Sequence, residues 1–299
     1  MRNALKFILF FVAISGTILL FTATDENDPG LQISPRNFII PTVDPTMDYW
    51  FANERVPVDN FDVRERLERE FIVNTYRHSN TILNIKKSRR FFAVIEPILK
   101  EYGIPEDFKY TAVAESDFRN ATSPAGARGV WQLMKGTARD YGLEVNDYVD
   151  ERLHLEKATR VACEHLKDYY SKFGSWTLAA AAYNMGASAL SKELERQGAE
   201  SYYDLNLSEE TNRYILRLVA IKYVLMNPGH FGFEIEEEET YPPLDNYAVV
   251  EVDTTISNLG DFARQFGVSY RMLKIYNPWL RSYTLPNKSG KQYEIKIPK

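Results

Sequence analysis

The sequence contains little cysteine and little histidine, and neither sign of charge predominates strongly. Cys163 is its single cysteine in 299 residues, so no disulfide can form within the chain, and its helical, apolar neighbourhood predicts a buried, unreactive thiol. The four histidines lack the spacing of zinc ligands, and no segment resembles a calcium-binding loop. With 36 basic and 41 acidic residues, the chain lacks the positive charge of a general nucleic-acid binder.

Apolar residues, in contrast, are abundant enough for a sizeable core, at 44% of the chain with 13% aromatic. One uncharged run, residues 7–24, follows Arg2 and Lys6 and precedes an acidic segment. This pattern predicts a signal peptide or an N-terminal membrane anchor over residues 1–24, with the remainder of the chain outside the cytoplasm. No cysteine follows the run, which excludes a lipoprotein anchor.

The rest of the chain divides by composition and periodicity. Residues 25–60 are rich in Pro, Asp and Asn, and we interpret them as a stalk. Residues 61–227 show the apolar spacing of successive helices and predict a mainly α-helical domain, interrupted by one glycine-containing segment at residues 114–134. Residues 228–245 contain an acidic run and two adjacent prolines, which are typical of a linker. Residues 246–299 begin with the alternating apolar pattern of a strand. Two short helical patterns and a second strand pattern follow, which predicts a small α+β module of βααβ order.

Glu115 ends one of these helical stretches and is a candidate for acid–base chemistry. An acid that acts near neutral pH needs a carboxyl kept protonated by apolar surroundings, and raising its pKa to about 6 costs roughly 2 kcal/mol. The apolar residues at 112–114 and Phe118 could provide these surroundings. Most glutamates at helix ends are solvated, so Glu115 alone leaves both interpretations open. No second carboxylate is suitably placed in this segment, because a helix would direct Asp117 away from Glu115.

Several ordered motifs around Glu115 resemble a known family. They read ESDF, SPAGARGVWQLM, AAYNMG and ETNRYI, and together they extend over about residues 85–225. This order and spacing are similar to those of the family 1 lytic transglycosylases, the Slt-like enzymes of the goose-type lysozyme superfamily. The resemblance implies a lysozyme-like helical catalytic domain.

The resemblance also implies roles for individual residues. Glu115 matches the single catalytic acid and base of the family. A further set of residues matches substrate-binding positions, namely Ser116, Ser123, Gln132, Tyr183, Asn184 and Tyr214. Structural roles remain alternatives for four of them: Ser116 could support the helix turn, Ser123 a loop turn and Asn184 a helix end, while Tyr214 also fits a core stripe.

The implied reaction is cleavage of peptidoglycan glycan strands during cell-wall remodelling. The bond between N-acetylmuramic acid (MurNAc) and N-acetylglucosamine (GlcNAc) is broken without water, and a 1,6-anhydro-MurNAc end forms. No cofactor and no metal are required. A goose-type lysozyme-like hydrolase and a non-catalytic peptidoglycan-binding protein remain alternatives. The substrate places the protein on the periplasmic side of a bacterial cell envelope, with the membrane as a further partner if residues 1–24 are not removed.

The C-terminal residues 246–299 resemble a LysM domain, a binder of GlcNAc-containing glycans. The helix pattern and the Asn277–Pro278 pair are kept, whereas the usual Gly-Asp-Thr-Leu opening is replaced by VDTTI. Two roles therefore stay open for this module, namely glycan binding and packing against the catalytic domain.

Overall fold

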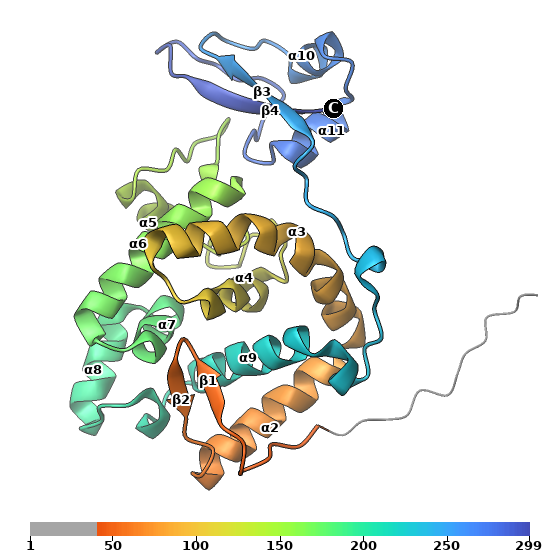
Figure 1. The fold of residues 1–299 in the computed structure, drawn as a ribbon. Coiled ribbons are helices and arrows are strands. Elements are labelled where there is room, and N and C mark those ends of the chain that lie inside the picture. Colours follow the sequence, from red (N-terminus) through yellow and green to blue (C-terminus); the bar gives the residue numbers. More distant parts are fainter. Residues whose placement is uncertain (1–40) are drawn as a thin grey trace, which may run out of the picture. The chain divides into compact units, whose positions relative to one another are not determined.

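The computed structural model describes residues 41–299, so the predicted signal peptide or anchor at residues 1–24 lies outside the described residues. Figure 1 shows the order of the elements. They are β1 (Tyr49–Phe51), β2 (Glu54–Val56), α2 (Phe61–Tyr76), α3 (His78–Tyr102), η1 (Glu106–Phe108), α4 (Lys109–Ser116), α5 (Lys135–Asp140), η2 (Glu151–Leu153), α6 (Leu155–Phe173), α7 (Trp176–Met185), α8 (Ala187–Gln197), η3 (Tyr202–Asp204), α9 (Glu209–Met226), η4 (Pro228–Phe231), η5 (Glu237–Glu239), β3 (Tyr247–Val252), α10 (Leu259–Gln265), α11 (Tyr270–Tyr276) and β4 (Tyr293–Pro298).

Several helix ends coincide with local sequence signals. Gly174 ends α6 in the left-handed conformation at φ 67°, which glycine adopts without steric cost. The Ser175 hydroxyl accepts a hydrogen bond from the Leu178 amide at the start of α7, and Ser208 caps α9 through the Thr211 amide. These helix ends follow from side-chain and backbone chemistry that is local to each terminus.

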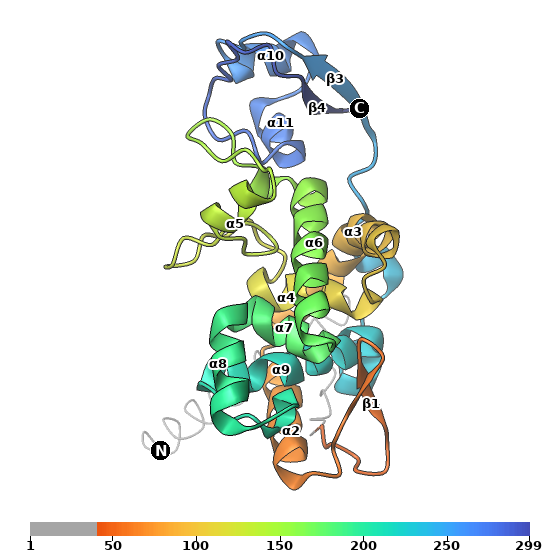
Figure 2. The same ribbon diagram turned by 90° about the vertical axis from the view of Figure 1, so that its left-hand side faces the viewer.

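Helix α4 lies in the middle of the helical domain (Figure 1), where it contacts α3 and α9. Helix α2 packs along α9, and α6 packs against both α3 and α7 (Figure 2). The side chains between them form one apolar core. Cys163 is fully buried in this core, and burial raises the pKa of its thiol to about 12, as expected for an unreactive cysteine.

Residues 41–60, the described part of the segment interpreted as a stalk, pack onto the helical domain. Strands β1 and β2 form an antiparallel hairpin, and Phe51, Val56 and Val58 are fully buried in the domain core. The stalk prediction is wrong for these residues, because three-residue strands are too short to show an alternating pattern. Glu54 at the hairpin accepts hydrogen bonds from the Trp176 and Thr177 amides, at 2.6 and 2.9 Å, and so stabilises the start of α7.

The acidic linker runs along the basic stretch of α3. Its first part still belongs to the helical domain, because Phe231 and Phe233 are buried in that core. Further on, the Tyr241 amide donates to the Lys86 carbonyl at 2.7 Å, and Arg89 lies 3.4 Å from the Glu237 carboxylate. The basic cluster of α3 therefore binds the linker.

The C-terminal module has the predicted βααβ order. Strands β3 and β4 pair antiparallel from Tyr247 with Pro298 to Val252 with Tyr293. The buried side chain of Asn277 donates to the Lys296 carbonyl at 2.6 Å and accepts from the Lys296 amide, which fixes α11 against β4. The prediction of a mainly α-helical domain followed by a small α+β module is confirmed. No helix within residues 41–299 has both the length and the apolar character needed to cross a membrane.

Candidate active site

The Glu115 carboxyl lies near the C-terminal end of α4 and keeps a partly exposed surface. Burial raises its pKa to about 7, and a hydrogen bond from the Tyr214 hydroxyl, 2.6 Å from Oε1, only partly opposes this rise. The negative charge of Glu210 raises the pKa further, and the positive charge of Arg217 lowers it. A carboxyl with this pKa is populated in both protonation states at neutral pH, so it can donate and accept a proton.

Two tyrosines flank the carboxyl from two other helices. Burial raises the pKa of the Tyr183 and Tyr214 hydroxyls well above the usual value, and the nearby Glu115 charge raises both further. Both side chains therefore stay neutral and act as hydrogen-bond donors. Tyr214 of α9 donates to Glu115, while Tyr183 of α7 donates to the Trp131 carbonyl at 2.7 Å. The structure thus brings Glu115 and these two predicted residues into one cluster.

Residues 117–134, which we call the active-site loop, connect α4 to α5. The loop folds back on itself through bridges from Arg128 to Thr122 and to Leu133. Gln132 has a positive φ of 49°, and its amide nitrogen donates to the Gly129 carbonyl at 2.8 Å. Among the described residues no hydrogen bond to the Gln132 amide oxygen is found, so this oxygen is available to a substrate.

Ser116 was predicted to bind substrate, and the structure gives it a different role. Its hydroxyl is buried, donates to the Val130 carbonyl at 2.9 Å and accepts from the Arg119 amide. Ser116 therefore ties the end of α4 to the active-site loop, which leaves no face for a sugar. This is the helix-turn role that the sequence left open for it.

Ser123 and Asn184 also take part in local structure. The Ser123 hydroxyl accepts from the Ala127 amide at 3.0 Å, which closes the tip of the active-site loop. Within residues 41–299 no acceptor for its hydroxyl proton is found, so the proton can be donated to a ligand. The Asn184 amide oxygen accepts from the Thr211 hydroxyl at 3.0 Å and joins α7 to α9. Ser123 therefore remains compatible with a substrate contact, whereas Asn184 holds the two tyrosine-bearing helices together.

Charged residues of α9 around Tyr214 were missed at the sequence level. Glu210 and Arg217 lie about one turn before and after Tyr214, and both act on the pKa of Glu115. The fully buried Glu70 of α2 binds Arg213 at 2.5 Å and lies 3.7 Å from the Arg217 guanidinium. The charged residues of α9 recur at i, i+3 and i, i+4, a spacing that the sequence shows. Glu70, in contrast, is distant from them along the chain.

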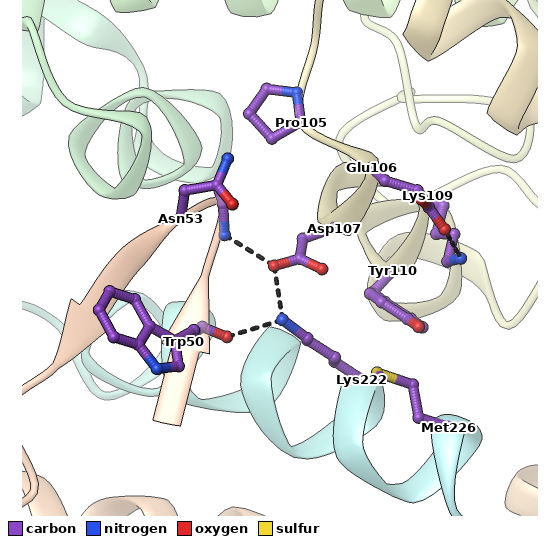
Figure 3. A pocket seen from close by; sticks show the side chains of 10 residues that line it. Trp50, Asn53, Pro105, Glu106, Asp107, Lys109, Tyr110, Lys222 and Met226 are labelled. Carbon is purple, nitrogen blue, oxygen red and sulfur yellow. Dashed lines mark hydrogen bonds and ion pairs between the residues drawn. The ribbon is translucent and has the colours of Figure 1, made fainter. Parts of the chain in front are cut away.

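The cavity in Figure 3, of about 450 Å³, lies beside the β1–β2 hairpin, and none of the predicted site residues lines it. The charged groups within it are paired with one another. Asp107 accepts from Lys222 at 2.8 Å and from the Ala52 amide at 2.7 Å, and Lys222 also donates to the Trp50 carbonyl. This cavity therefore offers no unpaired catalytic group, and the candidate active site is the cluster around Glu115.

Two families match this chain. Residues 93–206 match the transglycosylase SLT domain, and residues 248–299 match the soluble lytic transglycosylase C-terminal LysM-like domain. The membrane-bound lytic murein transglycosylase D of Escherichia coli K12 is 26% identical over 268 residues, which cover 86% of this chain and 57% of that protein. The chain thus spans less than two thirds of this relative.

Among solved structures, a lytic transglycosylase Slt of Pseudomonas aeruginosa, studied as an inactive mutant, is 23% identical, covering 50% of this chain and 26% of that one with a TM-score of 0.39. The 70 kDa soluble lytic transglycosylase of Escherichia coli is 22% identical, with the same coverage and a TM-score of 0.37. By its sequence matches, the chain carries an SLT transglycosylase domain, which contains Glu115, followed by a C-terminal LysM-like domain.

Proposed function

We propose that this protein is a peptidoglycan lytic transglycosylase, which cleaves the MurNAc-β-1,4-GlcNAc bond and leaves a 1,6-anhydro-MurNAc end. The observation that carries the proposal is the carboxyl of Glu115, with a pKa of about 7 and a partly exposed face, beside two neutral tyrosines within an SLT domain. The name of the Escherichia coli relative, a lytic murein transglycosylase, supports the same reaction.

In the first step, protonated Glu115 gives its proton to the glycosidic oxygen, and the bond from that oxygen to C1 of MurNAc breaks. The carbonyl oxygen of the MurNAc N-acetyl group bonds to C1 and takes up the positive charge. Glu115 is then a carboxylate, and the hydrogen bond from Tyr214 stabilises it more strongly than the neutral acid. This difference lowers the barrier, because the interaction strengthens as the charge develops.

In the second step, the Glu115 carboxylate takes the proton of the C6 hydroxyl of the same sugar. The freed oxygen bonds to C1, the bond from C1 to the N-acetyl oxygen breaks, and the 1,6-anhydro ring closes. Glu115 ends the cycle protonated, so no water, cofactor or metal is consumed. A carboxyl pKa near neutrality suits both directions of proton transfer.

The active-site loop is proposed to hold the sugar on which this chemistry occurs. The free proton of the Ser123 hydroxyl can donate to an acetamido carbonyl, and the unbound amide oxygen of Gln132 can accept from a sugar hydroxyl or N–H group. The loop therefore offers one donor and one acceptor, which matches an N-acetylated sugar.

Hydrolysis of the same bond by a second carboxylate is the competing reaction. Most glycosidases of this kind place two carboxyl groups about 5–10 Å apart. Glu210 is the candidate, since its charge acts on Glu115. However, its side chain is 71% exposed and lies 4.0 Å from Arg217, an ion pair typical of a solvated helix surface. Substrate-assisted closure without water is therefore favoured.

Mass spectrometry of the products released from purified sacculi tests the proposal, with Glu115→Gln and Glu210→Gln as variants. We expect anhydro-muropeptides from the wild type and from Glu210→Gln, and none from Glu115→Gln. Release of reducing ends, heavier by one water, together with loss of activity in Glu210→Gln would indicate hydrolysis. Binding to sacculi with no soluble product from the wild type would indicate a non-catalytic wall-binding protein.

The proposed substrate implies a place on the periplasmic side of a bacterial envelope. The relative from Escherichia coli is named as membrane-bound, and the apolar run at residues 7–24 supports export or anchoring of this chain. Cell fractionation with an antibody against the C-terminal module tests this. Recovery in the cytoplasmic fraction would contradict the proposal.

A further inference from the structure

The C-terminal module shares its core with a segment of the catalytic domain, residues 144–153, which we call the support segment. Val149 and Leu153 are buried among the apolar side chains of the module. Val149 forms a β-bridge with Leu280. On either side of this bridge, the Asp150 amide donates to the Trp279 carbonyl at 2.9 Å, and the Arg281 amide of the module donates to the Tyr148 carbonyl at 2.7 Å. The module is therefore joined to the catalytic domain through backbone and core.

An ion pair strengthens this junction at its edge. Lys291 of the module lies 2.5 Å from the Glu144 carboxylate and 3.9 Å from that of Glu151, while Tyr293 also donates to Glu144 at 3.0 Å. Burial opposes ionisation of Glu144, but the hydrogen bond and the charge of Lys291 outweigh it and lower the pKa of this carboxyl. Lys291 of the module thus pairs closely with Glu144 and lies near Glu151, which also binds Lys157 of α6 at 2.5 Å.

The support segment in turn holds the active-site loop. The guanidinium of Arg152, which is 5% exposed, donates to the carbonyls of Gly126 and Leu133 at 3.0 and 3.2 Å. Asp150 binds the same guanidinium with two contacts of 2.9 Å and binds Arg128 of the loop at 3.0 Å. Two buried, paired charges thus fix the loop in its middle and near its C-terminal end.

The two segments approach each other closely at Gly129. Gly129 has a φ of 84°, and a Cβ atom at this position would lie 2.1 Å from the Arg152 carbonyl oxygen. Such contact means that a shift of Arg152 of even a fraction of an ångström changes the position of the loop backbone. Gly129 precedes Gln132 by one turn of the loop and accepts its side-chain hydrogen bond.

We infer that the C-terminal module is a positioning element of the active site, which holds the support segment and, through Arg152, sets the position of the loop that bears Ser123 and Gln132. This differs from a tethered module that only adds affinity for glycan. The activity part of the inference rests on the proposed function, whereas the effect on the loop does not.

Four full-length variants test the inference. Lys291→Glu places a carboxylate between Glu144 and Glu151 and should loosen the junction by repulsion. Adding Glu144→Lys to it restores opposite charges and should rescue the effect. Arg152→Lys keeps the charge but loses the forked donor. Lys288→Glu is the matched control, since Lys288 is an exposed lysine of the same module for which no ion pair is found within residues 41–299.

The first measurement is amide hydrogen exchange of residues 121–134 without substrate, with circular dichroism to verify folding. We expect exchange in this loop to rise about tenfold or more in Lys291→Glu and Arg152→Lys, to return towards the wild-type rate in the charge-swapped protein, and to stay unchanged in Lys288→Glu. Unchanged loop exchange in Lys291→Glu overturns the inference. If Arg152→Lys fails to fold, the charge-swap pair still decides.

The second measurement is kcat and KM on purified glycan strands. Loosening of the loop should lower kcat about tenfold in Lys291→Glu, with a smaller change in KM, and the charge swap should restore kcat. A rise in KM alone with an unchanged loop would show a glycan-binding module and overturn the inference. A third outcome is also informative: loop exchange rises in Lys291→Glu, but no protein, not even the wild type, is active. This outcome would refute the proposed function and leave the positioning role standing.

Discussion

Replacing Glu115 with Gln should stabilise the folded protein, and the gain should depend on pH. The carboxyl has a pKa raised from its usual 4.5 to about 7 because folding removes it from water. Folding therefore favours the protonated acid. Below the unfolded pKa both states carry the proton, so Glu115 has no destabilising effect. As the pH rises, the unfolded state ionises first and stability falls until the folded state also ionises.

The size of the effect follows from the two pKa values. A rise from 4.5 to about 7 corresponds to roughly 3 kcal/mol of lost stability once both states are ionised. The partly exposed surface of Glu115 lets water screen some of this cost, so we expect roughly 2–3 kcal/mol above neutral pH. The amide of Gln has nearly the same shape and cannot ionise, so the variant avoids the cost.

Urea unfolding of the wild type and Glu115→Gln at about pH 4 and about pH 8.5 measures the effect. The variant should match the wild type at the lower pH, apart from a constant offset, and exceed it by roughly 2–3 kcal/mol more at the higher pH. Glu200→Gln is the control, because the Glu200 side chain is exposed and its contact with water changes little on folding. An equal difference at both pH values, or a wild type that gains stability relative to the variant, would refute the reasoning.

The remaining predictions concern the surroundings of Glu115. Tyr214→Phe removes a bond to the ionised carboxyl, so kcat/KM should fall about 10–100-fold and the alkaline limb of its pH profile should move upwards. Gly129→Ala drives a Cβ atom into the Arg152 carbonyl, and urea unfolding should show a loss on the order of 3 kcal/mol. Glu70→Ala removes the buried carboxylate that binds Arg213 and Arg217 and leaves these arginines with the exposed Glu209 and Glu210 as partners, so urea unfolding should show a similar loss of about 3 kcal/mol, and a smaller one for Glu70→Gln.

Local signals explain what the sequence predicted well. Ser208 and Gly174 mark helix ends by their own backbone and side-chain chemistry, independently of the rest of the fold. Alternation in β3 and β4 is equally local, so the order of the C-terminal module could be predicted. The prediction that Glu115, Tyr183 and Tyr214 belong to one site had a different basis. These residues lie on three helices, and only the order of the family motifs connects them.

The features that escaped prediction depend on contacts between distant parts of the chain. Nothing local indicates that Glu70 meets Arg213, 143 residues away. Arg152 lies in a charged stretch that is typical of a solvated helix start, yet it is buried under the active-site loop. Ser116 stands beside Glu115 in sequence, but the helix turns its hydroxyl into the core.

The bond between Glu54 and the start of α7 has a consequence for where this domain can be divided. The region that matches the SLT family begins at residue 93, yet a side chain from residue 54 holds the first turn of the helix that carries Tyr183. A fragment trimmed to the matched region would begin α7 with unsatisfied amides and would expose the core beneath Phe51. The smallest piece of this protein able to refold with an intact Glu115 cluster is therefore set by the hairpin, and it starts ahead of residue 49.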